Sequence, residues 1–148
     1  MKKSTKKWLI ITAIICLIGV IGTCVLQTNF GNTKIENVRY ITQSGYEQSL
    51  DIYIPANATA ENPAPAVFVQ HGGNNNKEEM QHYCIELARR GYVAVGVDMY
   101  GMGESQPLSD GEWLTMGRGL YDAVRYGVTL PYIDEDRISL LGYSRGGK

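Results

Sequence analysis

The feature of this sequence that most constrains its fold is a glycine–serine pattern near the carboxyl end. Residues Ile138 to Gly142 are apolar or glycine except for Ser139, which is typical of a short strand buried on both faces, and they lead into Gly142-x-Ser144-x-Gly146. A serine at a sharp strand-to-helix turn has a strained backbone, and its flanking positions must be glycine because a side chain would collide with the neighbouring strand and helix. The pattern predicts a nucleophile elbow that exposes the Ser144 hydroxyl at the carboxyl edge of a sheet.

The rest of the sequence decides between this interpretation and a structural Gly–Ser turn, because a chain with 17 glycines in 148 residues can contain the pattern by chance. An apolar run precedes the pattern directly. A second signature, His71-Gly72-Gly73, follows the apolar run Ala66 to Val69, where a loop that binds an oxyanion belongs. Together these segments favour Ser144 as a nucleophile.

The hydrophobic pattern between these motifs predicts alternating strands and helices. A hairpin at a sheet edge is expected over Lys34 to Thr42 and Ser49 to Ile54, and buried strands over Ala66 to Val69, Tyr92 to Val97 and the run that ends at Gly142. The start of another helix is expected after Ser144. This order predicts an α/β fold with a mainly parallel sheet and helices on both faces.

Two helices are expected between the strands, each opened by a capping box. Asn76 with Glu79 starts the first, which ends at Gly91, and Ser109 with Glu112 starts the second, which ends near Gly127. Their predicted apolar faces are Met80, Tyr83, Cys84, Leu87 and Ala88 in the first and Trp113, Met116, Leu120 and Val124 in the second.

The amino-terminal segment looks like targeting sequence. From Trp8 to Leu26 there are 19 residues without a charge, long enough to cross a hydrocarbon layer of about 30 Å, and four lysines precede them. Positive flanks stay in the cytoplasm, so we expect a single-pass protein of a cell membrane, bacterial in origin, with everything after Gln27 outside. The expected parts are residues 1–27, a linker over 28–34 and a domain over 35–148.

Three fates remain open for this segment. An uncleaved anchor ranks first, since a cleaved secretory peptide would have a shorter apolar core and an Ala-x-Ala-like site. The stretch Ile21-Gly22-Thr23-Cys24 resembles a lipoprotein box, although threonine is a poor residue before the lipidated cysteine. Lipidation at Cys24 and cleavage are therefore the alternatives.

Charge and glycine spacing exclude several classes of function. After Gln27 the chain has 10 basic and 15 acidic residues, a net charge of −5, which does not suit a nucleic-acid partner. The pair Gly101-x-Gly103 lacks the third glycine of a dinucleotide fingerprint, and Pro107 follows, so no nucleotide cofactor is expected, and no metal. Cys84 has no partner for a disulfide in the domain and belongs to the predicted core.

Residues 35–148 resemble the amino-terminal half of an α/β-hydrolase, closest to the group of dienelactone hydrolases, serine aminopeptidases and prolyl oligopeptidases. The resemblance rests on the approach to the elbow, Tyr132-Ile133-Asp134-Glu135-Asp136-Arg137-Ile138, and on Asp98-x-x-Gly101-x-Gly103-x-Ser105. Relatives often carry arginine and histidine where this chain has Tyr100 and Met102, which blurs the subfamily.

This resemblance implies a role for each matching residue. Ser144 would be the nucleophile, and the backbone N–H groups of Arg145 and Gly73 would form the oxyanion hole. His71 matches the oxyanion loop and not the general base, and His82 is expected on the exposed side of a helix.

The same resemblance implies that part of the site is missing. The catalytic acid and histidine follow the serine in this fold, and the sequence stops four residues after Ser144, so both are expected beyond Lys148 and the 148 residues alone should be nearly inert. The expected substrate is a small-molecule ester, a thioester or a peptide. A non-catalytic binding module is the alternative.

Overall fold

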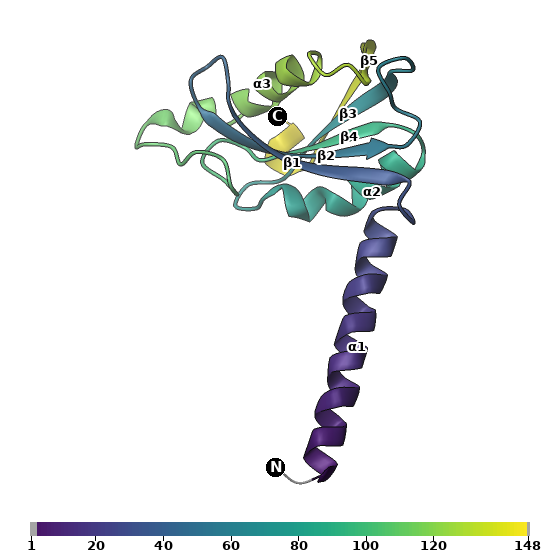
Figure 1. Cartoon of the computed structure of the whole chain (residues 1–148). Coiled ribbons are helices and arrows are strands. Elements are labelled where there is room, and N and C mark those ends of the chain that lie inside the picture. Colours follow the sequence, from purple (N-terminus) through teal and green to yellow (C-terminus); the bar gives the residue numbers. More distant parts are fainter. Residues whose placement is uncertain (1–2, 148) are drawn as a thin grey trace.

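The computed structural model describes residues 3–147, so Met1, Lys2 and Lys148 lie outside the described part. A long amino-terminal helix leads into a domain whose helices lie on both faces of a five-stranded sheet (Figure 1). The helices are α1 (Lys3–Gln27), α2 (Gln81–Arg89) and α3 (Arg118–Gly127), and the strands are β1 (Thr33–Ile41), β2 (Glu47–Pro55), β3 (Ala64–Gln70), β4 (Val93–Val97) and β5 (Ile133–Gly142). Short 3-10 turns occupy Lys77–Met80 (η1), Glu112–Thr115 (η2) and Ser144–Gly147 (η3).

The sheet has the strand order β1-β2-β4-β3-β5. β1 and β2 form the predicted antiparallel hairpin at one edge, β2 pairs antiparallel with β4, and β4, β3 and β5 are parallel. β1 begins at Thr33, which pairs with Pro55 of β2. The first strand of the domain thus starts two residues before the predicted boundary at residue 35. The alternation of strands and helices predicted the parallel strands β4, β3 and β5 correctly. The sheet as a whole is mixed and not mainly parallel, because β2 joins the hairpin to β4 by an antiparallel pairing.

Two apolar clusters hold the layers together, one on each face of β3. Phe68 belongs to the cluster that Leu120 and Val124 of α3 pack against, while Val69 belongs to the cluster of Cys84 and Ala88 in α2. Since neighbouring residues of a strand point to opposite faces, one strand contributes to both clusters. Cys84 is fully buried, as expected, and burial raises the pKa of its thiol to about 12.

The first helical segment starts after Asn76, as predicted, but its first turn is the 3-10 turn η1 and the predicted capping box does not form. Asn76 makes no side-chain capping bond, and the carboxylate of Glu79 accepts the N–H of Gly72 at 3.4 Å instead of reaching back to Asn76. The chain passes through η1 before α2 begins at Gln81. Tyr83, predicted in the core, is 45% exposed, because the buried side of α2 is formed by its neighbour Cys84 and by Ala88.

The second helix also begins later than predicted. The Glu112 carboxylate accepts the N–H of Ser109 at 2.7 Å, which is half of a capping box, but this opens only η2, and α3 begins at Arg118. Leu120 and Val124 pack against the core as predicted, whereas the side chain of Trp113 lies outside the described part. At the end of α2, Gly91 has the positive φ of +86° that a terminating glycine adopts.

The last strand is less buried than its sequence predicts. Ile138 and Leu141 pack against the two clusters, but Leu140 is 61% exposed and packs against neither. The reason is position, because β5 is an edge strand in the described residues and pairs only with β3. Residues 144–147 form the 3-10 turn η3 where the start of an α-helix was predicted.

Within residues 3–147, α1 alone is long and apolar enough to cross a membrane, and none of its apolar stretch is buried against the domain. A signal sequence near an amino terminus meets the same criterion. The structure therefore agrees with a targeting segment of either kind.

Candidate active site

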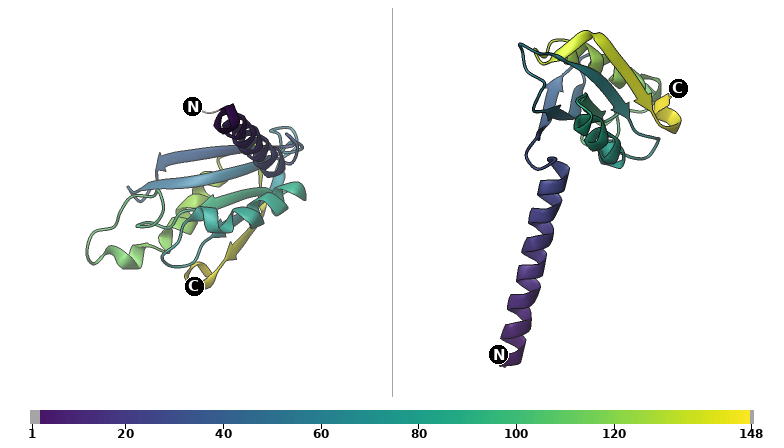
Figure 2. Two further views of the ribbon diagram at one scale, coloured as in Figure 1. Left: turned by 90° about the horizontal axis from the view of Figure 1, so that it is seen from below. Right: turned by 90° about the vertical axis from the view of Figure 1, so that its right-hand side faces the viewer.

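Ser144 lies at the carboxyl edge of the parallel strands, directly after β5. Its φ is +53°, in the left-handed region that a residue with a side chain rarely adopts, and the residue is exposed. Gly142 at the end of β5 lies opposite Gln70 at the end of β3, so the elbow stands beside the loop that follows β3 (Figure 2). The predicted strained turn is present.

The two glycines around Ser144 have no room for a side chain. A Cβ atom on Gly142 would overlap the carbonyl group of Gly146, and a Cβ atom on Gly146 would lie 2.5 Å from the carbonyl oxygen of His71. Both obstacles are backbone atoms, which cannot rotate away. The physical reason given for the pattern Gly142-x-Ser144-x-Gly146 is therefore confirmed.

The loop His71-Gly72-Gly73 packs against this turn. A Cβ atom on Gly72 would lie 3.7 Å from Cβ of Ser144, and one on Gly73 would lie 3.3 Å from Nε of Arg145. Gly73, one of the two residues expected to supply N–H groups to an oxyanion, therefore lies beside the side chain of Arg145, the other. Their role as an oxyanion hole stays a prediction.

His71 is fully buried, and both of its ring nitrogens have partners. The N–H of Met99 donates to Nε2 at 3.1 Å, so Nε2 is the acceptor, and Nδ1 lies 2.6 Å from the carbonyl oxygen of Gly72, to which it donates. A general base needs a free acceptor that faces the serine hydroxyl. The hydrogen bonds of His71 therefore fit a role in holding the shape of the loop. His82 is exposed on α2, where its ring centroid lies 4.2 Å from that of Tyr83.

Sequence reasoning did not predict a buried ionic network of Lys77, Asp98 and Glu104, which lies next to the loop of His71. The Lys77 side chain is 1% exposed, and its Nζ lies 2.9 Å from a carboxylate oxygen of Glu104 and 3.2 Å from one of Asp98. Asp98, also fully buried, accepts the backbone N–H groups of Lys77 at 2.7 Å and Glu104 at 2.9 Å. Asp98 Oδ1 is 3.8 Å from Nε2 of His71. The network joins the loops that follow β3 and β4.

The opposite charges in this network stabilise one another in their ionised forms. Burial by itself lowers the pKa of Lys77, but the hydrogen bond with Glu104 and the negative charge of Asp98 outweigh burial, and the pKa is raised. In return Lys77, helped by Arg39, lowers the pKa of Glu104 to about 2. In the sequence, Lys77 stands beside two glutamates at a predicted helix start, which is typical of a solvated surface residue. The one signal for the network was the spacing of Asp98 from Gly101, Gly103 and Ser105, which indicated a structured loop after β4.

Tyr100, one of the two residues that left the subfamily open in the sequence, is fully buried. Its hydroxyl donates to the carboxylate of Asp122 at 2.7 Å and lies 2.9 Å from the Thr42 hydroxyl. Burial, with the hydrogen bond to Asp122, raises the pKa of Tyr100. Tyr100 therefore has a structural role, because its hydroxyl joins the segment after β4 to Asp122 of α3.

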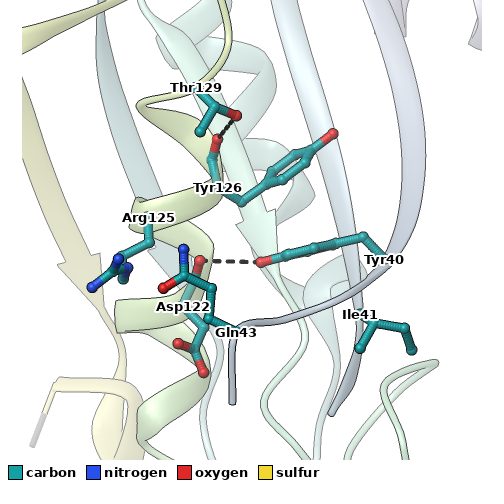
Figure 3. A pocket seen from close by; sticks show the side chains of 7 residues that line it. All are labelled: Tyr40, Ile41, Gln43, Asp122, Arg125, Tyr126 and Thr129. Atoms are coloured by element: carbon teal, nitrogen blue, oxygen red, sulfur yellow. Dashed lines mark hydrogen bonds between the residues drawn. The ribbon is translucent and has the colours of Figure 1, made fainter. Parts of the chain in front are cut away.

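A pocket of about 150 Å³ lies between β1 and α3, away from the elbow (Figure 3). The Tyr40 hydroxyl lies 3.2 Å from the carbonyl oxygen of Asp122 at this pocket, and it donates its proton to the side-chain oxygen of Gln48 at 2.7 Å. The pocket is lined by Tyr40, Ile41, Gln43, Asp122, Arg125, Tyr126 and Thr129, none of which belongs to the elbow or to the loop after β3. It is not part of the candidate active site.

Neither a protein-family model nor the sequence of a curated protein matches this chain. Several solved structures resemble it. A hypothetical protein from Pseudomonas aeruginosa is 24% identical with a TM-score of 0.64, over 74% of this chain and 35% of that one. The α/β hydrolase GrgF from Penicillium sp. sh18 is 23% identical with a TM-score of 0.63, and the match covers 77% of this chain and 39% of GrgF. An epoxide hydrolase from Vigna radiata is 18% identical with a TM-score of 0.58, and the match covers 76% of this chain and 31% of that enzyme.

These similarities show the fold. The domain has the fold of α/β-hydrolases, and the chain spans roughly a third of the length of the solved structures that it resembles. The finer resemblance to dienelactone hydrolases and their relatives stays a prediction.

Proposed function

We propose that this chain carries the nucleophile and the oxyanion loop of a serine hydrolase that α1 anchors in a membrane, with the domain outside the cytoplasm. One observation carries the proposal: Ser144 has a φ of +53° and packs against the loop of Gly72 and Gly73. In the proposed reaction the Ser144 oxygen attacks the carbonyl carbon of an ester, thioester or peptide. The Ser144 proton passes to a general base, the bond between the carbonyl carbon and the leaving group breaks, and the leaving group takes up that proton as the acyl-enzyme forms. Water then attacks the acyl-enzyme, which releases the acid and returns a proton to Ser144.

The strain at Ser144 supports catalysis over binding. A residue with a side chain in the left-handed region costs about 1–3 kcal/mol and persists only where its surroundings enforce it. Here two glycines without room for a side chain and the carbonyl oxygen of His71 enforce it. A binding module has no physical need for such a serine, whereas a nucleophile must project from the backbone at the edge of the sheet.

The proposal also requires a general base, since a serine hydroxyl is a weak nucleophile at neutral pH. Both ring nitrogens of His71 are occupied, and His82 is exposed on α2. We therefore propose that the base and its acid come from residues beyond Lys148. The non-catalytic binding module remains the second candidate, favoured by the engaged state of His71.

Active-site labelling separates the two candidates. The product of the whole gene, including any coding sequence after Lys148, is treated with a fluorophosphonate, which reacts with activated serines. We expect labelling of the unchanged protein and of Ser139→Ala, a control serine in β5, and no labelling of Ser144→Ala. Labelling that persists in Ser144→Ala would remove the nucleophile from its role, and an unlabelled but folded parent protein would favour the binding module.

A further inference from the structure

The connection between α1 and the domain is short and hydrogen-bonded throughout. Only residues 28–32 separate α1 from β1. The Phe30 N–H donates to the carbonyl oxygen of Val25, the Thr33 N–H to that of Thr28, and the Ala56 N–H to that of Asn32, each at 2.8 Å. A flexible linker leaves its backbone groups to water. This connection instead fixes the direction in which the domain leaves the helix.

Arg89 of α2 fastens the domain to the end of α1 by a second route. One terminal nitrogen of its guanidinium donates to the carbonyl oxygen of Leu26 at 2.9 Å, and the other lies 2.6 Å from Glu86. The last carbonyl groups of a helix lack the partner that a further helical turn would supply, and a cation there is favourable. The Leu26 carbonyl oxygen also accepts the N–H of Asn29, at 3.3 Å. Arg90 pairs with Glu86 as well and has no contact with α1 among its hydrogen bonds. The last turn of α2 thus caps α1.

These contacts place one face of the domain beside the end of α1. Figure 1 and the right-hand view of Figure 2 both show α2 on the side of the domain from which α1 leaves. α3 packs on the opposite face of the sheet. The outer face of α2 is formed by the exposed residues His82, Tyr83, Glu86, Arg89 and Arg90. Phe30, next to the end of α1, is 73% exposed.

The length of α1 sets the depth of this face relative to a bilayer. The uncharged stretch from Trp8 to Leu26 has 19 residues, which span roughly 28 Å as a helix and match a hydrocarbon core of about 30 Å. Leu26 then lies at the boundary of the core. A guanidinium bonded to its carbonyl oxygen lies in the headgroup layer, which is about 5–7 Å thick on each side.

We propose that the outer face of α2, together with Phe30, rests on the phospholipid headgroups around the carboxyl end of α1. The inference rests on the membrane anchor of the proposed function and adds a fixed orientation to it. Arginine guanidinium groups suit lipid phosphates, and aromatic rings such as those of Tyr83 and Phe30 favour the interface. The face covered by α3 consequently points away from the bilayer.

Photo-cross-linking in phospholipid nanodiscs tests this orientation with the full chain. The photoreactive p-benzoylphenylalanine replaces Tyr83 on α2 or, as a matched control, Tyr121 on α3, which is also an exposed helical tyrosine. After irradiation we expect phospholipid adducts, seen as a gain of one lipid mass, at position 83 and none at position 121. Equal adducts at both positions would overturn the inference.

The same substitution at Phe30 separates failure of the orientation from failure of the anchor. Adducts at position 30 without adducts at position 83 would overturn the orientation alone. An intact mass that lacks α1 would overturn the anchor and this inference with it. As a further check, Arg89→Ala should lower the adduct yield at position 83 more than Arg90→Ala does, because Arg89 alone of the two also holds the Leu26 carbonyl oxygen. Equal yields in the two variants would contradict the fixed orientation that the contact with Leu26 provides.

Discussion

The carbonyl oxygen of Gln70, the last residue of β3, accepts the N–H of Tyr143 at 3.1 Å. This bond ties the strand that delivers the loop of His71 to the residue just before Ser144. Parallel strands end at the same edge of a sheet, so two segments more than 70 residues apart in sequence form one surface. The position of the candidate nucleophile therefore depends on the pairing of β3 with β5.

Replacing Gly146 by alanine should destabilise the turn. The added Cβ would lie 2.5 Å from the His71 carbonyl oxygen, a backbone atom, and overpacking of this kind costs about 1–3 kcal/mol. Gly117→Ala is the control, because nothing lies within 4 Å of its Cβ. Urea unfolding of the full chain in detergent micelles measures both free energies. Equal values for the two variants would show that the turn relaxes without cost.

Replacing Lys77 by methionine should leave the buried carboxylate of Asp98 without its cation. Breaking a buried ion pair from one side costs about 3–5 kcal/mol, so we expect a large fall in the free energy of unfolding. Lys34→Met is the control, since Lys34 pairs with Glu36 at the surface, and exposed pairs contribute about 0–1 kcal/mol. The same urea titration measures both. A small effect of Lys77→Met would mean that water replaces the lysine.

Acid should weaken the domain through Glu104. Lys77 and Arg39 lower its pKa from the usual 4.5 to about 2, so the folded chain holds this proton less tightly than the unfolded chain. The contribution to stability is complete above pH 4.5 and is lost as the pH falls towards 2. Glu104→Gln should reduce the slope of stability against pH over this range. An unchanged slope in the variant would assign the acid sensitivity to other carboxyl groups.

The lysine-rich start of the chain predicts the orientation of α1. A reporter fused after residue 148 should lie outside the cytoplasm, because positive flanks stay inside. Protease added to intact cells should remove that reporter and spare one fused ahead of residue 1. Protection of the carboxyl-terminal reporter would contradict the orientation.

The exposed edge of β5 should make residues 28–148 associate when α1 is removed. Leu140 is 61% exposed, and among residues 3–147 the strand β5 pairs on one side alone; edges of this kind pair with other chains. Leu140→Lys should shift the sedimentation profile towards monomer, since edge charges oppose this pairing. A monomeric parent fragment with a cooperative melting transition would contradict the prediction.

The sequence by itself determined the features that rest on local geometry. The glycines at 142 and 146 indicated the strained turn, because a turn of that shape excludes side chains at fixed spacing. Continuous apolar runs predicted β3 and β4 as strands covered on both faces, and helical spacing placed Cys84 in the core. The resemblance to α/β-hydrolases assigned His71 to the oxyanion loop and not to the general base, and that assignment stays a prediction.

Only the tertiary structure decided features that depend on distant residues. Lys77 is buried because Asp98 and Glu104, 21 and 27 residues further along the chain, surround its ammonium group. Glu79 turns away from Asn76 because the N–H of Gly72 is within its reach. Leu140 has the apolar character of a core residue yet is exposed, since burial depends on which strand stands next to β5. A pattern of residue types records how a segment can fold, whereas its partners are set by packing across the whole domain.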